Sequence, residues 1–323
     1  MARPPRFFLR SRFAQDPGCA RRERGDTRRM STASVTRLLA LAAIWGGSFL
    51  FMRIAAPVLG PVRLIAWRVV LAAAFLAGLA WLWRRRLDAR THWRHYLILG
   101  TCNSALPFLL FAFAAQRLSA SLLSILNATA PIFAAAITAL RARSLPPPRI
   151  VLGLLLGIGG VTVLASFDPM MVESGAVVAL LAGLAGSVSY GAASIYAKSP
   201  PGVDPFANAL GSMASASVIL VPLVPFFPAH AASGPLVVAS VAALGVLCSG
   251  VAYLLYFRLI ADLGPASALT VTFLIPVFGV LWGTLFLHEP VGAHTLAGAL
   301  IVVVGTALVT GFAPRMLLAR APR

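Results

Sequence analysis

The chain has 323 residues, of which 59% are hydrophobic and 11% are charged, and its mean hydropathy is +0.87. Soluble domains carry about 25% charged residues and disordered chains carry more, so this composition excludes both classes and indicates a polytopic membrane protein. The net charge of +18 comes from arginines in the first 29 residues and between apolar runs, not on one face of a soluble fold, which argues against a nucleic-acid partner.

Ten apolar stretches follow one another along the chain, each about 20 residues long and therefore long enough to cross a bilayer as a helix. The segments between them are too short to fold as extramembrane domains. We therefore predict an all-α polytopic membrane protein whose function is built from the helices and their ends. The predicted spans are residues 38–59, 64–83, 96–115, 118–140, 150–167, 175–197, 206–227, 236–257, 263–287 and 291–313.

The two ends of the chain are expected to be cytoplasmic tails. Residues 1–34 form a strongly basic tail, and residues 313–323 form the second tail. The alternative is that the first tail results from an over-extended start, because Met30 would also serve as a first residue. With both tails inside, most arginines fall on the cytoplasmic side and the outer segments keep only Arg53, Arg63 and Arg117. This asymmetry predicts an even number of crossings, with both termini in the cytoplasm.

The two halves of the chain match when one is shifted by 145 residues. The shift places Gly46 on Gly191 and Pro131 on Pro276, among other pairs. Each half holds five spans, and because five is odd the second half enters the membrane from the opposite side. Inverted repeats of this kind are typical of secondary transporters. The predicted repeats are residues 35–167 and 175–312.

Four motifs carry a family resemblance: Ala-Ala-Ile-Trp-Gly-Gly-Ser-Phe at 42–49, Asn-Ala-Thr-Ala-Pro-Ile-Phe at 127–133, Leu-Gly-Pro-Ala-Ser-Ala at 263–268 and Leu-His-Glu-Pro at 287–290. They resemble the EamA-type branch of the drug/metabolite transporter (DMT) superfamily. The resemblance implies ten helices in two inverted five-helix repeats, a bacterial inner membrane, and export or exchange of small metabolites such as amino acids. The chain departs from the family pattern at Ser144, which matches Glu289, so a role that needs both acids is not expected.

Three prolines inside spans, Pro107, Pro131 and Pro276, are expected to break their helices. Each removes the hydrogen bond to the carbonyl four residues earlier. Because an unsatisfied polar group in hydrocarbon costs several kcal/mol, the broken turns should face protein or a wet cavity. The freed carbonyls all belong to polar residues, namely Asn103, Asn127 and Thr272.

We predict a substrate site around these breaks, with groups from both repeats. Trp45 and Tyr190 match each other across the repeat and are expected to line it, with Trp67 and Tyr256 as further aromatic candidates. The alternative is that the polar groups only hydrogen-bond between helices. The predicted substrate-binding residues are Trp45, Arg68, Asn103, Ser104, Asn127, Tyr190, Ser249, Tyr253, Thr270 and Thr272.

Two charged residues need an explanation. Arg68 lies well inside the second span, where it could attract a substrate carboxylate, or instead snorkel outward or satisfy free carbonyls; Met213 matches it in the other repeat. Glu289 lies at the outer end of the ninth span. It either ties the loop to the start of the tenth helix, where the helix dipole favours an anion, or titrates as a coupling site.

These features favour a secondary transporter that exports or exchanges a small polar or amphipathic metabolite by alternating access. A non-transporting scaffold or sensor and a lipid-modifying membrane enzyme are the alternatives, although the sequence contains no Ser/His/Asp array, HExxH motif or P-loop. Three cysteines without CxxC spacing imply no metal site, and no cofactor is expected. The expected partners are a small-molecule substrate and the lipid bilayer, and a homodimer remains open.

Overall fold

The structure is a computed structural model that describes residues 32–85, 87–143, 146–167, 174–197, 203–263, 268 and 270–311. Most of the tail 1–34, the tail 313–323 and Ser144 lie outside these residues. Every regular secondary-structure element in the described residues is helical. Nine helical stretches in this part of the chain are long and apolar enough to cross a membrane, and α13 (Val271–Leu287) is a further, shorter apolar helix. The predicted all-α polytopic fold is therefore confirmed.

The first half of the chain forms five spans. The third span contains a π-helical segment, η1, and the fourth is interrupted between α5 and α6. The elements are α1 (Thr32–Leu59), α2 (Pro61–Leu82), α3 (Ala89–Gly100), η1 (Thr101–Ala105), α4 (Leu106–Ala114), α5 (Ala120–Asn127), α6 (Ala130–Ala142) and α7 (Pro148–Phe167).

The second half repeats this arrangement. A π-helical segment, η4, again lies in its third span, and it covers the positions that match η1. A short 3₁₀ helix, η3, ends its second span. The elements are α8 (Ala176–Tyr196), α9 (Pro205–Leu220), η3 (Val221–Phe226), α10 (Pro235–Ala242), η4 (Ala243–Val251), α11 (Ala252–Leu263), α13 and α14 (Ala293–Thr310).

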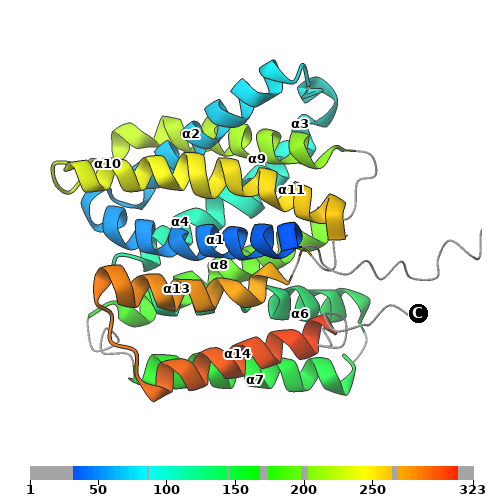
Figure 1. Cartoon of the computed structure of the whole chain (residues 1–323), viewed down its shortest axis with the longest axis vertical. Helices are drawn as coiled ribbons and strands as arrows, with labels where there is room; N and C mark the ends of the chain where they lie inside the picture. The colour runs from blue at the N-terminus through cyan, green and yellow to red at the C-terminus, as the bar shows by residue number, and fades with distance from the viewer. Residues whose placement is uncertain are drawn as a thin grey trace, which may run out of the picture.

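Figure 1 shows these helices as a bundle in which elements of the two halves intermingle. The helices α7 and α14 lie side by side at one edge of the bundle, while α2 packs with α9 at the opposite edge. Between the edges, α1 packs against α13 of the other half. The start of α1 and the end of α14 lie at the same end of the bundle, as an even number of crossings requires.

Equivalent glycines make equivalent contacts in the two halves. A Cβ on Gly46 would lie 2.9 Å from the Gly279 backbone nitrogen of α13, and a Cβ on Gly191 would lie 2.8 Å from the Ala134 nitrogen of α6. The shift of 145 places Gly46 on Gly191 and Ala134 on Gly279, so the two contacts are equivalent. Each half therefore packs its first helix on the fourth span of the other half, and only glycine permits so close an approach.

The pair α7 and α14 follows the same rule. Gly153 packs on the Gly305 carbonyl oxygen, where a Cβ would lie at 2.7 Å, and Gly298 packs on the Gly160 carbonyl oxygen, where it would lie at 2.9 Å. The shift of 145 places Gly153 on Gly298 and Gly160 on Gly305, so the two contacts are equivalent. The contacts between the two five-helix repeats thus follow an approximate two-fold symmetry, as expected for inverted copies.

The predicted helix breaks are only partly present. The helix α5 ends at Asn127 and α6 begins at Ala130, just before Pro131. The segment η1 precedes Pro107, but η4 has the same π geometry although Ala252 stands where Pro107 does. Proline is therefore not required for the π geometry.

The expected break at Pro276 is wrong, because α13 is helical on both sides of this proline. Pro276 is the sixth residue of the helix, so the helical hydrogen bond that its missing N–H cannot make, to Thr272, belongs to the first turn. The lost hydrogen bond therefore falls next to an existing helix end, where it disturbs little of the regular ladder.

Candidate substrate site between the two repeats

Arg68 lies where the two repeats meet. It projects from α2, and only 4% of it is exposed. Its Nε donates a hydrogen bond to the Ser249 hydroxyl of η4 at 2.9 Å, and its Nη1 lies 3.7 Å from the Met52 sulfur of α1. The guanidinium also lies over the Phe108 ring, 3.7 Å from its centroid, in a cation–π contact. The side chain is therefore held inside the protein and does not snorkel to the membrane surface.

No carboxylate pairs with this guanidinium in the described part of the chain. The two ion pairs seen there join Asp262, near the end of α11, to Arg37 and Arg258. Arg68 uses Nε and Nη1 for neutral partners, and Nη2 has no hydrogen bond to the described residues. The guanidinium is therefore a buried charge without a counter-ion among the described residues, which is a costly arrangement.

Two groups of aromatic side chains accompany Arg68. In one, Tyr190 of α8 stacks on Phe111 of α4 with 6.0 Å between ring centroids. In the other, Trp45 of α1 meets Tyr253 of α11 edge-on at 6.4 Å. Tyr190 also meets Phe108, the ring beneath the guanidinium, edge-on with 6.4 Å between ring centroids. These predicted residues thus belong to one cluster, in which rings form apolar walls around a cation.

Hydrogen bonds join both π-helical segments to the opposite repeat. Asn103 of η1 donates from Nδ2 to the Tyr253 hydroxyl at 3.4 Å. The Trp45 Nε1 donates to the Cys248 carbonyl of η4 at 3.2 Å, and the Ser189 hydroxyl donates to the Cys102 carbonyl of η1 at 2.7 Å. Irregular helical turns expose carbonyls that regular helices use internally, and π segments are frequent at functional sites. Here the exposed carbonyls bind side chains across the repeat boundary.

The symmetry of the cluster fails at one position. Ser104 and Ser249 match across the repeat, and both are fully buried. Ser249 accepts from Arg68, whereas the Ser104 hydroxyl has no hydrogen-bond partner among the described residues. The reason is that Met213 matches Arg68, and a thioether donates no hydrogen bond. Ser104 is therefore a second polar group that a ligand could engage.

Replacing Ser104 with alanine should raise the melting temperature of the purified protein. The change removes a buried hydroxyl without a partner, which costs about 1–3 kcal/mol. Ser249→Ala should lower the melting temperature, because Arg68 then loses the acceptor of its Nε. Thermal unfolding of both variants in one detergent tests this, and a lower melting temperature for Ser104→Ala would contradict the unpaired state of the hydroxyl.

The other predicted residues lie apart from the contacts of Arg68. Asn127 ends α5 half-buried, and its amide makes no hydrogen bond to the described residues. Thr270 is buried just before α13, and Thr272 is half-buried in its first turn. Trp67, a further aromatic candidate for lining the site, is 52% exposed, whereas the neighbouring Arg68 is buried. Successive residues of a helix point about 100° apart, so Arg68 and Trp67 cannot both face inward equally.

Sequence reasoning missed the apolar partners of Arg68, which are Phe108 and Met52. Apolar side chains inside an apolar span all look alike in a sequence, so nothing marks those that meet a buried cation. One usable signal was the spacing of Phe108, which follows Ser104 by four residues and so shares its helical face.

Glu289 ties the two repeats together, but at a different helix from the one predicted. Its carboxylate accepts hydrogen bonds from the Ala120 nitrogen at 2.6 Å, the Ser121 nitrogen at 3.1 Å and the Ser121 hydroxyl at 2.6 Å. These groups form the first turn of α5, so the expectation that Glu289 caps the tenth helix, α14, is wrong. The physical cause is the one expected, because an anion satisfies the free N–H groups of a helix start.

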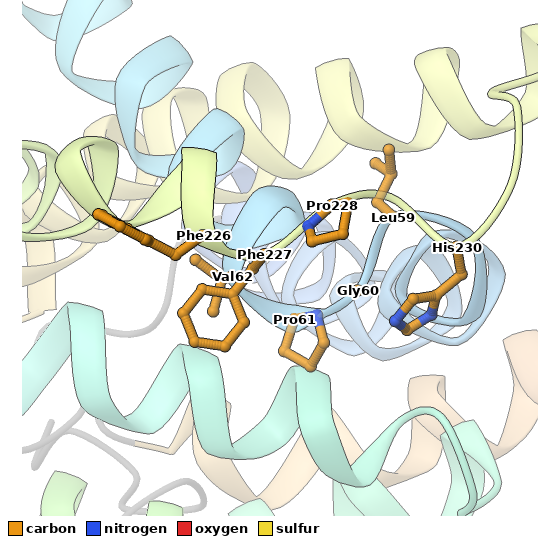
Figure 2. A pocket seen from close by; sticks show the side chains of 8 residues that line it. All are labelled: Leu59, Gly60, Pro61, Val62, Phe226, Phe227, Pro228 and His230. Atoms are coloured by element: carbon orange, nitrogen blue, oxygen red, sulfur yellow. The ribbon is translucent and has the colours of Figure 1, made fainter.

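A pocket of about 150 Å³ lies where α1 meets α2 and the chain leaves η3 (Figure 2). Beside it, the His230 backbone nitrogen donates a hydrogen bond to the Val58 carbonyl at 2.9 Å. Its lining shares no residue with the cluster around Arg68 and is apolar apart from the imidazole, so it offers little to a charged substrate. The lining residues are Leu59, Gly60, Pro61, Val62, Phe226, Phe227, Pro228 and His230.

Known proteins resemble this chain over most of its length. An uncharacterized transporter from Archaeoglobus fulgidus is 27% identical over 286 residues, which cover 84% of this chain and 96% of that protein. The uncharacterized transporter YvbV from Bacillus subtilis is 25% identical over 285 residues, which cover 86% and 92%. A solved crystal structure, 18% identical, covers 87% of this chain and 98% of its own with a TM-score of 0.59, and it indicates a shared fold.

The family model agrees with the resemblance seen in the motifs. The model of the EamA-like transporter family matches the chain twice, at residues 33–166 and 177–311, so that each match covers five spans. The chain is therefore a multi-pass membrane protein that belongs to the EamA-like transporter family.

Proposed function

We propose that this protein is a secondary transporter that exports or exchanges a small polar or amphipathic metabolite by alternating access. Family membership and relatives named as transporters support the transport function. The substrate and the mode of transport are inferred from the cluster around Arg68.

One observation carries the proposal: the polar cluster is assembled from both repeats. Arg68 bonds to Ser249, and Asn103 bonds to Tyr253. Each pair has one member in each repeat, so any movement of one repeat against the other changes the cluster. A carrier needs this coupling, because the groups that bind the substrate must become accessible first from one side and then from the other.

The mirrored packing of Gly46 and Gly191 supports the same mechanism. Two halves with equivalent contacts and opposite orientation can exchange conformations, and the exchanged state has nearly the same contacts. A scaffold or a lipid-modifying enzyme does not need this property, so we propose neither role and no cofactor. We further propose that the protein lies in a bacterial inner membrane, with both termini and the arginine-rich segment 84–94 in the cytoplasm.

Flux through proteoliposomes tests the proposal. The liposomes are loaded with labelled amphipathic metabolites, including acids, amino acids and amines, and exchange and net efflux are measured. We expect saturable flux, reduced at least tenfold in the double variant Asn103→Ala, Tyr253→Ala. The matched control is Thr284→Val, which removes an exposed hydroxyl that bonds only within its own helix, to Val280.

Each result bears on a different part of the proposal. Wild-type rates in a folded double variant would contradict a site between the repeats. Flux that fails to saturate, or that equals flux through empty liposomes for every compound, would contradict transport. Circular dichroism and gel filtration of the variants show whether they are folded.

A further inference from the structure

We propose that the substrates are monocarboxylates with an aromatic or similarly apolar body, and that Arg68 binds their carboxylate. The site is expected to favour such an acid over the amino acid with the same side chain, and the amino acid over the amine. This inference rests on the proposed transport function and names the class of substrate.

The first step is charge. Arg68 is buried and is held by a hydroxyl, a sulfur atom and a ring, all of which are neutral. Its guanidinium is a cation, because arginine is not deprotonated in proteins. Its Nη2 has no hydrogen bond to the described residues. A carboxylate can accept two parallel hydrogen bonds from a guanidinium, and such charge-assisted pairs are about twice as strong as neutral ones. A monoanion would also neutralise the charge of the cluster.

The second step is the supply of donors. The Ser104 hydroxyl is buried without a partner and precedes Phe108, which contacts Arg68, by four residues. Asn103 and Tyr253 supply an amide and a hydroxyl. The cluster thus offers the carboxylate oxygens several N–H and O–H groups, as a site for an anion requires.

The third step is the unfavourable environment for an ammonium group. The carbonyl of Cys248 is bound by Trp45, and the carbonyl of Cys102 is bound by Ser189. The Ile44 carbonyl accepts from the Cys248 thiol at 3.3 Å. These three carbonyls already accept side-chain hydrogen bonds, and an ammonium would be repelled by the guanidinium without a carboxylate among the described residues of the cluster to compensate. This is why an acid without the amine is preferred.

The fourth step is the apolar body. Trp45, Tyr190 and Tyr253 are each half-buried, and their rings contact further rings. Among these further rings, Phe257 lies 5.8 Å from Tyr253 between centroids. Aromatic walls of this kind favour a ligand ring through edge-on and offset contacts, which stabilise the ligand beyond the burial of its apolar area.

Three compounds with one ring separate these steps. 3-Phenylpropionate, phenylalanine and phenethylamine carry a carboxylate, both charged groups, and an ammonium, respectively. The binding of each compound to purified wild-type protein in detergent is measured by the shift that it causes in the melting temperature. Flux of each compound is measured separately in proteoliposomes. We expect the affinity order 3-phenylpropionate, then phenylalanine, then phenethylamine.

The test variant is Arg68→Met. It reproduces the residue that the fold already holds at the matching position, because Met213 is fully buried there. We expect the affinity for 3-phenylpropionate to fall by about 10- to 100-fold, the loss of one charge-assisted pair, and that for phenethylamine to stay or rise. Thr284→Val is the control, since its hydroxyl bonds only to Val280 within α13 and makes no contact with Arg68, and it should preserve the order.

Three results would overturn the inference: wild-type protein that does not bind 3-phenylpropionate, phenethylamine that binds as tightly as the acid, or an Arg68→Met variant that weakens all three compounds equally. The last result would give Arg68 a structural role only. Failure of the transport proposal is distinguishable, because it would leave the order of binding intact while the bound acid shows no flux.

Discussion

Alanine at Gly46 should lower the stability of the bundle by about 1–3 kcal/mol, the cost of overpacking a closed contact. The added Cβ would lie 2.7 Å from the Phe278 Cβ and 3.0 Å from the Ile275 carbonyl oxygen of α13. Two of its three nearest neighbours are backbone atoms, which cannot rotate away. The melting temperature of the purified variant measures the loss, and flux should fall with it, because this contact joins the repeats.

The symmetry of the fold makes this prediction sharper. Gly191→Ala should destabilise the protein to a similar extent, because its Cβ would lie 2.8 Å from the Ala134 nitrogen in the mirrored contact. Gly78→Ala and Gly159→Ala are the matched controls, since a Cβ at either position meets nothing within 4 Å. Equal melting temperatures for Gly46→Ala and Gly78→Ala would contradict the close approach of α1 to α13.

Removal of the Glu289 carboxylate should cost about 2–3 kcal/mol of stability. Glu289→Ala leaves two backbone N–H groups and the Ser121 hydroxyl at the start of α5 without their acceptor. Hydrogen bonds to a charged group contribute about 1.5–3 kcal/mol, and unmade buried ones carry a penalty. Thermal unfolding measures the effect, which we expect to be larger than that of Ser121→Ala, where only the hydroxyl is lost.

A graded series checks that the carboxylate acts as a cap. Glu289→Gln keeps one acceptor oxygen and should fall between the wild type and Glu289→Ala. If Glu289→Ala unfolds at the wild-type temperature while transport changes, the residue acts in coupling and the cap contributes little.

The helical spans could be predicted because hydrophobic length is a property of consecutive residues. The ten apolar stretches correspond to helices in the described part of the chain, although the start of the ninth predicted span, 263–287, falls partly outside it. Helix interruptions were harder. Pro131 marks a real break, whereas Pro276 does not, because the cost of a proline depends on its distance from the helix end.

The sequence could predict which residues form the candidate site better than it could predict which of them contact one another. Arg68, Asn103 and Tyr253 could be singled out because polar groups are rare inside apolar spans. Their pairing could not, since the bond from Arg68 to Ser249 links residues 181 positions apart. The exposure of Trp67 could not be predicted either, because its apolar neighbours mark no helical face, and only packing shows that 52% of it is exposed.

The amino-acid sequence alone establishes the number of spans, the inverted repeat and the isolated charge of Arg68, because each of these depends only on the kind and spacing of residues. The tertiary structure decides which helix start Glu289 caps, which hydroxyl remains unpaired, and which rings contact the guanidinium. These depend on the rotation of each helix about its axis and on contacts between helices distant in sequence. A sequence that is apolar on all sides of a helix does not specify that rotation.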